Sequence, residues 1–162
     1  MEEGQVFELA DVISGKIINC GLTPECSNAS KGEKKVWRLL WDYGVYVNRD
    51  IWFTHDECYF KDLKTTKGGI GRYDFVIWSR KANKDNKVIR LVEVDGEQHY
   101  KEGNFFPQTL KARQKDDQIK NEYAWSHNIP LIRIPYSAID SLTIEDIFSD
   151  KYLVKPQGNP FP

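Results

Sequence analysis

One segment, Val88–Asp95 (VIRLVEVD), limits the fold of this chain more than any other. Its apolar and β-branched residues predict a buried strand, yet Glu93 and Asp95 stand two residues apart near its end. Because side chains alternate along a strand, both carboxylates should lie on one face of the sheet. The segment therefore predicts a core strand that places two acids side by side.

A second strand is expected over Arg72–Trp78 (RYDFVIW), which carries Asp74 in its middle. The polar stretch Ala82–Lys87 (ANKDNK) between the two strands is typical of a turn, and Gly96 should stop the second strand. If the strands pair through this turn, Asp74 comes close to Glu93.

A helix is expected from Lys31 to Tyr43, with Ser30 as its N-cap, Glu33 as the capping-box partner and Gly44 as its end. The other expected elements are a strand over Tyr46–Phe53, a loop over Lys61–Gly71, a helix over Gln108–His127, a strand over Leu131–Ile134 and a helix over Ile139–Phe148. This order predicts an α/β fold, a mixed β-sheet flanked by α-helices.

The bulk composition favours a single globular domain. The 162 residues are 40% hydrophobic and 13% aromatic, which is enough for a packed core. No apolar run reaches the roughly 18 residues of a membrane span, and the first ten residues carry acids where a signal peptide needs positive charge. Three cysteines (Cys20, Cys26 and Cys58) then indicate reduced thiols, so we expect a cytoplasmic protein.

The net charge is −1, but the basic residues are clustered. The clusters are Lys31–Arg38, Lys61–Arg72, Arg80–Arg90 and Lys111–Lys120. Such clusters can bind a phosphate backbone, although solvated loops and helix faces explain them equally well.

Clustered carboxylates repel one another and are costly to bury unless a cation neutralises them. An all-oxygen set suits Mg²⁺ or Mn²⁺, which can activate a water against a phosphodiester. The alternative is an exposed sheet face or ion pairs with Arg72 and Arg90.

His99, just after the strand, is a candidate acid or base because imidazole titrates near neutrality. His55 and His127 have no such setting, and we take them as structural.

On the long helix, Arg113, Asp117 and Lys120 share one side, as either site residues or a surface ion-pair set.

These residues resemble the PD-(D/E)XK nucleases, which have an Asp on one hairpin strand and an acid-x-Lys on the next. Asp74 and Glu93 match the two acids, while Asp95 stands where that superfamily usually has Lys. The chain is more similar to the branch that contains the very-short-patch repair endonucleases and the phage-type EDxHD homing endonucleases. The matching segments, within residues 30–136, are SKGEKKV with Glu33, RYDF with Asp74, VDGEQH with His99 and RQKDDQIKNEY with Asp117.

The resemblance implies a restriction-endonuclease-like fold and a Mg²⁺- or Mn²⁺-dependent DNA endonuclease. By the same resemblance, Asp74 and the main-chain carbonyl of Val94 would hold the metal, with Glu93 assisting directly or through water. The implied catalytic set is Glu33, Asp74, Glu93, Asp95, His99 and Asp117, supported by Glu97, Gln98 and Lys120. In this set His99 would assist proton transfer paired with Asp117, Glu33 would orient a water, and Asp116 is the alternative to Asp117.

We divide the chain into an N-terminal extension (1–29), a nuclease domain (30–150) and a C-terminal tail (151–162). Relatives of this kind often carry a zinc ribbon before the nuclease domain. Here five residues separate Cys20 from Cys26 and no second ligand pair lies upstream, so we interpret the extension as a degenerate remnant without zinc.

Three functions are open at this point. They are a DNA endonuclease, a nucleic-acid-binding module of the same fold that no longer cuts, and a structural protein with a charged sheet. For the first two, Trp52, Tyr100 and Phe105 could stack on bases, with core packing as the alternative. Cutting both strands would favour a homodimer.

Overall fold

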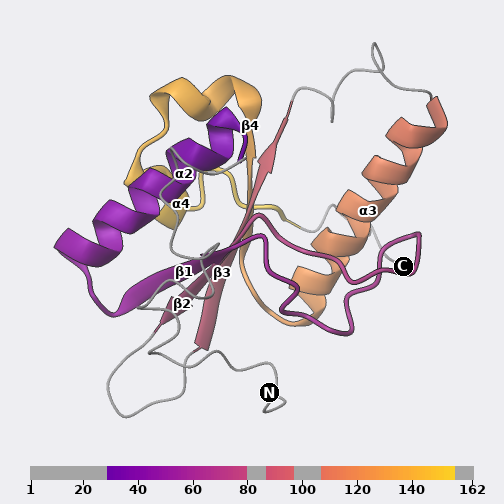
Figure 1. Ribbon diagram of the computed structural model, residues 1–162, viewed down its shortest axis with the longest axis horizontal. Helices are drawn as coiled ribbons and strands as arrows, with labels where there is room; N and C mark the ends of the chain where they lie inside the picture. Colours follow the sequence, from indigo (N-terminus) through magenta and orange to yellow (C-terminus); the bar gives the residue numbers. More distant parts are fainter. Residues whose placement is uncertain (1–28, 80–86, 97–106, 156–162) are drawn as a thin grey trace.

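A mixed four-stranded sheet forms the centre of the fold in the computed structural model, which describes residues 29–79, 87–96 and 107–155 (Figure 1). The strands are β1 (Ile51–His55), β2 (Phe75–Ser79), β3 (Lys87–Asp95) and β4 (Leu131–Pro135), in the spatial order β1-β2-β3-β4. The first three are antiparallel neighbours, and β4 runs parallel to β3. The predicted α/β class with a mixed, helix-flanked sheet is therefore confirmed.

Helices cover both faces of the sheet. On one side lie α2 (Lys31–Asp42), the 3-10 helix η6 (Tyr136–Ser141) and α4 (Ile144–Phe148), and on the other lies α3 (Pro107–Ser126) (Figure 1). The long crossover that parallel β3 and β4 require contains α3. None of the described helices is long and apolar enough to span a membrane.

Two apolar clusters form the core, one on each face, because neighbouring residues of a strand point in opposite directions. Phe75, Ile77 and Val92 pack under α2, whereas Val76, Trp78 and Leu91 pack with the residues near α3. The same alternation continues to the end of β3. It puts Glu93 on the α3 side together with Leu91, and Val94 on the α2 side together with Val92.

Helix α2 begins as predicted and ends differently. Ser30 and Glu33 form the expected capping box. Gly44 does not stop the chain, which continues through a π-helical turn, η4 (Tyr43–Val47). A Cβ on Gly44 would lie 2.7 Å from the Trp52 ring, so this glycine is needed for close packing instead. As a result the first strand starts at Ile51, and the predicted start at Tyr46 is wrong.

The pairing of β2 with β3 sets which residues meet at the site. Phe75 pairs with Val92 and Ile77 with Arg90, but Trp78 pairs with Val88. One β3 residue, Ile89, is therefore a bulge without a partner on β2. Because of this one-residue shift, continuing the register beyond Phe75 sets Glu93, and not Val92, opposite Asp74. The connecting turn over 80–86 lies outside the described residues.

The C-terminal part also differs from the expectation of one helix over Ile139–Phe148. It divides into η6 and α4, and Thr143 caps the second helix by accepting from Asp146 N–H. Beyond it, Arg133 N–H donates to the Tyr152 carbonyl at 3.0 Å and Val154 N–H donates to the Leu131 carbonyl at 2.8 Å. The first residues after 150 thus extend the edge of the sheet beside β4.

Candidate active site

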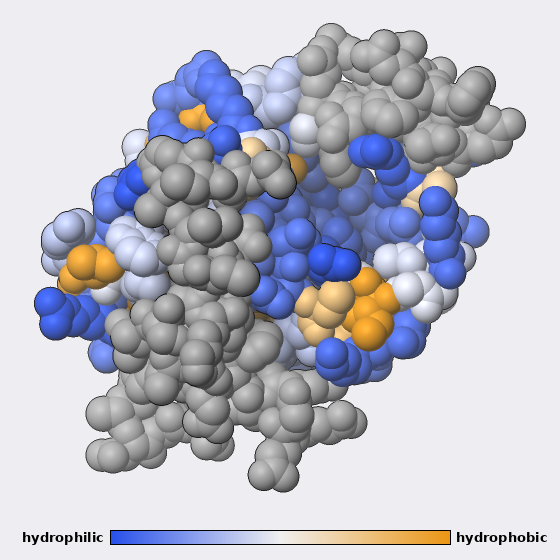
Figure 2. Space-filling view, in the orientation of Figure 1, coloured by the Kyte–Doolittle hydropathy of each residue, from blue (hydrophilic) through white to orange (hydrophobic). Residues whose placement is uncertain are grey.

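A cavity of about 550 Å³ opens where β2 begins and β3 ends, beside the N-terminus of α2. Figure 2 shows hydrophilic surface in the recessed region between the sheet and α3. The charged residues that line the cavity are Lys31, Glu33, Asp74, Glu93, Asp95, Lys120 and Asp140. Acids therefore outnumber bases around this space.

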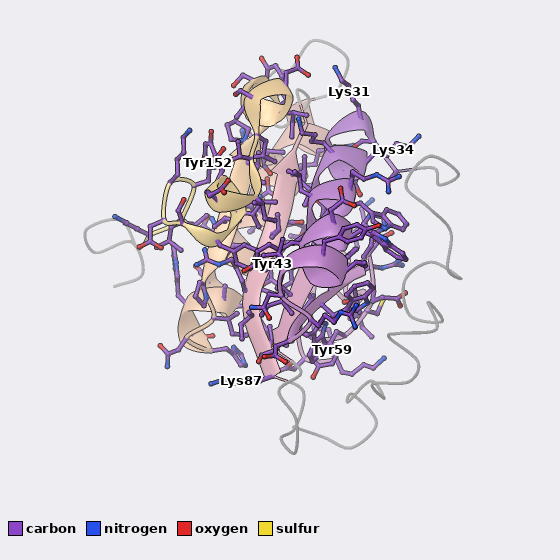
Figure 3. All side chains as sticks on the ribbon, turned by 90° about the vertical axis from the view of Figure 1, so that its left-hand side faces the viewer. Lys31, Lys34, Tyr43, Tyr59, Lys87 and Tyr152 are labelled. Atoms are coloured by element: carbon purple, nitrogen blue, oxygen red, sulfur yellow. The ribbon has the colours of Figure 1, made fainter. Side chains whose placement is uncertain are left out.

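The N-terminus of α2 reaches the cavity because residue 32 is a glycine. A Cβ at Gly32 would lie 2.7 Å from Val94 Cγ1 and 3.1 Å from Ile139 Cδ1. Close approach of the helix to the end of β3 brings Glu33 to the cavity wall. Figure 3 shows Lys31 and Lys34 projecting outward from the same end of α2, where Lys31 Nζ lies 3.1 Å from Asp140 Oδ1.

Asp74 and Glu93 meet as the sequence predicted. The backbone N–H of Asp74 donates to Glu93 Oε2 at 2.8 Å, and the backbone N–H of Val94 donates to Asp74 Oδ2 at 2.8 Å. Both acids line the same cavity, and Glu93 is only 4% exposed. These bonds hold the two carboxyl groups in fixed positions at the point where the two strands part.

Asp74 is the acid with the most unfavourable surroundings. Burial raises its pKa well above the ordinary value, and the charges of Glu93 and Glu33 raise it further. Within the described residues, no cation lies within ion-pair distance of Asp74, and its Oδ1 has no hydrogen bond. A carboxylate in this setting favours a bound cation.

Lys120 supplies the positive charge that the sequence motif lacks after Glu93. Its Nζ donates to Glu93 Oε1 at 2.6 Å, reaching from α3 across to the sheet. Burial lowers the pKa of Lys120, but Glu93 and Asp74 more than offset that effect, and the net pKa lies above the ordinary value. Tyr73 Oη, which donates to the Lys120 carbonyl at 2.8 Å, fixes this turn of α3 against the sheet.

Asp95 lines the cavity but is bound by Arg133, whose guanidinium donates to Asp95 Oδ1 at 2.8 Å. The same guanidinium lies 3.5 Å from Asp117 Oδ1 and donates to Asn121 Oδ1 at 2.8 Å. Arg133 therefore ties the ends of β3 and β4 to α3. The bond from Arg133 to Asp95 Oδ1 favours a supporting role for Asp95 over direct catalysis.

The structure separates the two neighbouring acids of α3. Asp117 points to the sheet, toward Arg133 and Asp95. Asp116 points the other way, and its Oδ1 accepts from Thr66 N–H at 2.8 Å in the 61–71 loop. Of the three residues that share this side of α3, Asp117 and Lys120 both contact residues of the sheet.

His55, which we took as structural, contacts a site residue. It ends β1, and its Nε2 lies 2.8 Å from Glu33 Oε1. Sequence reasoning could not find this contact, because His55 stands in an apolar strand 22 positions from Glu33 with no acidic neighbour in that strand.

Two other expectations about side chains can be decided. Trp52 is 6% exposed and packs against Trp41 at 5.3 Å, so it belongs to the core and does not present a stacking surface. Arg72 and Arg90 do not pair with the site acids: Arg72 lies 3.8 Å from Asp56, and Arg90 donates to the carbonyls of α4 and its C-cap.

Several predicted residues lie outside the described part of the chain. These are Glu97, Gln98, His99, Tyr100, Phe105, Cys20 and Cys26. The structure therefore bears on the acids and Lys120 but not on the histidine of the predicted site.

An oxygen-binding cation fits the described residues in a limited way. Within 29–79, 87–96 and 107–155, no three His, Cys, Asp or Glu side chains are arranged to hold a metal ion. Mg²⁺ needs only one or two carboxylates, because water and substrate phosphates supply its other ligands. Asp74 offers its open Oδ1. Since N–H and C=O of one strand residue point the same way, the Val94 carbonyl also faces the Asp74 side.

Comparisons of the chain with protein-family models, with curated proteins and with solved structures gave no match.

Proposed function

We propose that this chain is a Mg²⁺- or Mn²⁺-dependent DNA endonuclease with a restriction-endonuclease-like fold, of the PD-(D/E)XK type. One observation carries the proposal: half-buried Asp74 stands against Glu93 and Glu33, and the nearby Lys120 is already bound to Glu93. Keeping such a carboxyl group ionised without a cation is unfavourable. A functional site is the usual reason for retaining it.

In the proposed site, Asp74 Oδ1 and the Val94 carbonyl would hold the metal, and Glu93 would act through a water because both of its oxygens accept hydrogen bonds. When bound, the cation would neutralise the phosphate and lower the pKa of an attacking water. Lys120 holds Glu93 in place through the bond from its Nζ to Glu93 Oε1. Lys120 would thereby supply the positive charge beside the second acid that the lysine of the PD-(D/E)XK pattern supplies. Lys120 does so from helix α3, whereas the lysine of the pattern lies on the strand.

Glu33 lines the cavity from α2, whereas Asp74 and Glu93 line it from the sheet. In this position Glu33 would orient the attacking water. By resemblance, His99 would assist proton transfer with Asp117, whose side chain faces the sheet. Asp95 and Arg133 would hold the end of β3 in position for both groups. Glu33, Asp74, Glu93 and Asp95 thus line one space, an arrangement suited to hydrolysis of a phosphodiester by positioning and electrostatics.

Double-stranded DNA is the proposed substrate. Exposed lysines stand on the elements that carry site residues or lead into them: Lys31 on α2, Lys61, Lys64 and Lys67 in the loop before β2, and Lys111 and Lys115 on α3. Such groups can bind backbone phosphates without reading sequence. A cut in both strands would call for two copies of the site in a homodimer, and the small, odd number of cysteines favours action in the cytoplasm, a host's if the protein is encoded by a phage.

The direct test is nicking of a supercoiled plasmid with Mg²⁺, with Mn²⁺ and with EDTA. We expect conversion to the open-circular or linear form with either metal and none with EDTA, and Asp74→Ala should remove it. Cutting that persists in EDTA, or wild-type cutting by the Asp74 variant, would contradict the proposal.

The second candidate is a DNA-binding module of the same fold that does not cut. Its support is the Lys120–Glu93 pair, which partly neutralises the site without a metal. Salt-dependent DNA binding with no nicking in any metal would favour this candidate over the endonuclease.

A further inference from the structure

His55 occupies a buried position directly behind Glu33. It is the last residue of β1 and pairs with Phe75, the residue next to Asp74. Its side chain is 5% exposed, and its ring lies between Trp37 at 4.8 Å and Phe75 at 4.9 Å. The ring therefore has little freedom to turn, and its only described polar contact is with Glu33.

The contacts of the two ring nitrogens identify the hydrogen-bond donor. Nε2 lies 2.8 Å from Glu33 Oε1, whereas Nδ1 is buried and has no hydrogen-bond partner among the described residues. A carboxylate can only accept, so Nε2 carries the hydrogen. The geometry therefore makes Nε2 of His55 the donor and Oε1 of Glu33 the acceptor.

This bond decides which part of Glu33 is open to the cavity. Oε1 is held by His55, while Oε2 accepts only a long 3.4 Å bond from Ser30 N–H at the start of α2, on the cavity wall. Burial raises the pKa of Glu33, but the hydrogen bonds from His55 and Ser30 more than offset burial and lower it overall.

We propose that His55 is a positioning residue of the site, which fixes Glu33 in one rotamer with its Oε2 directed to the cavity. This inference rests on the proposed endonuclease function, because it assigns His55 a role in the same reaction through Glu33. His55 itself touches neither substrate nor metal in this proposal.

The test is a double-mutant cycle on steady-state plasmid cleavage with Mg²⁺, using His55→Phe, Glu33→Gln and both together. Phenylalanine keeps the packing between Trp37 and Phe75 but removes the donor. Loss of a supporting partner of this kind commonly costs 10- to 100-fold, and we expect a fall of about tenfold in kcat with little change in KM. In the Glu33→Gln background, His55→Phe should cause no further fall.

A matched pair of polar variants keeps the test decisive if His55→Phe does not fold. Glutamine can place an N–H near the position of Nε2, whereas the shorter asparagine cannot reach Glu33. We expect His55→Gln to recover most of the wild-type kcat and His55→Asn to resemble the donor-free variant, at similar melting temperatures.

The possible results distinguish a failure of the proposed role of His55 from a failure of the proposed endonuclease function. The role of His55 would be overturned if His55→Phe slowed cleavage equally in the wild type and in the Glu33→Gln background. It would also be overturned if the glutamine and asparagine variants cleaved equally fast. Either result would leave the endonuclease function intact. A wild-type protein that cuts DNA in no metal would overturn the proposed function, and the inference with it.

Discussion

Asp74 and Glu93 stand opposite each other across β2 and β3, and the backbone N–H of Asp74 donates to Glu93 Oε2 at 2.8 Å. The Val94 N–H returns a bond of equal length to Asp74 Oδ2. Beyond the last paired residues of the two strands, these backbone N–H groups therefore donate to side-chain carboxylates and not to backbone carbonyls of the neighbouring strand. The strands part at this point with both carboxyl groups already oriented, so the proposed cation site would need little rearrangement.

Replacing Asp74 by Asn should separate function from stability. The amide oxygen can still accept from Val94 N–H, but the charge that would hold the metal is lost. We expect cleavage to fall to background, the melting temperature without metal to rise at neutral pH, and the Mg²⁺-induced rise in melting temperature to disappear. Differential scanning fluorimetry with and without Mg²⁺ measures the last two, and a metal response equal to that of the wild type would remove Asp74 from the metal site.

The raised pKa of Asp74 also predicts a pH dependence of the metal-free protein. Its causes are burial and the charges of Glu93 and Glu33, so the native state binds this proton more tightly than the unfolded state does. The resulting stability is present at low pH and is lost as pH rises from the ordinary Asp pKa, about 4, through the raised native pKa.

Denaturant melts of the wild type and Asp74→Asn at a series of pH values can isolate this effect. The lowered pKa of Glu33 acts in the opposite direction, because its contribution is lost as pH falls, but it is present in both proteins. The Asn variant should therefore gain stability over the wild type as pH rises. A pH-independent difference between the two proteins would show that Asp74 titrates normally.

Replacing Lys120 by Met should destabilise the fold, because it leaves Glu93 buried without its cation. Removing one partner of a buried ion pair costs about 3–5 kcal/mol, and the lower end applies here since Lys120 is not fully buried. Lys120→Arg keeps the charge as a control. Adding Glu93→Gln to Lys120→Met should restore much of the lost stability in urea unfolding, and an additive loss would show that the two residues do not act as a pair.

The sequence predicted the hairpin that carries Asp74 and Glu93 because both signals are local. Period-2 alternation puts the acid at position 93 on one face, and the polar turn pairs the strands. The bulge at Ile89 has no comparable signal in the sequence, yet it decides that Glu93 and not Val92 faces Asp74. A strong local pattern thus gave the correct pair without showing the irregularity that aligns it.

The contacts that sequence reasoning missed all join distant segments. Lys120 lies 27 residues beyond Glu93, on a crossover helix whose docking is set by packing against the sheet, and Arg133 lies 38 residues beyond Asp95. His55 reaches Glu33 only because β1 is the neighbour of β2 and α2 covers that face. Residue spacing along the chain carries no information on such distances.

Asp95 should affect stability more than cutting, because its carboxylate is bound by Arg133. Asp95→Asn weakens this charged bond while keeping an acceptor. We expect a loss on the order of 1–3 kcal/mol in the free energy of unfolding. Single-turnover cleavage below the melting transition should change by only a few fold. A cleavage loss as large as that of the Asp74 variant, at unchanged stability, would return Asp95 to the catalytic set.

Matched substitutions can distinguish the two neighbouring acids of α3. Asp117 faces Arg133 and the sheet, whereas Asp116 accepts from Thr66 N–H in the loop before β2. We expect Asp117→Asn to slow cleavage strongly, while Asp116→Asn, a control of identical chemistry one residue away, should leave the rate nearly unchanged. His99→Ala should resemble Asp117→Asn in rate and keep the Mg²⁺-induced melting shift, since neither residue is proposed to hold the metal. If Asp116→Asn were the slower of the two aspartate variants, the alignment of α3 with the resembling family would have to move by one residue.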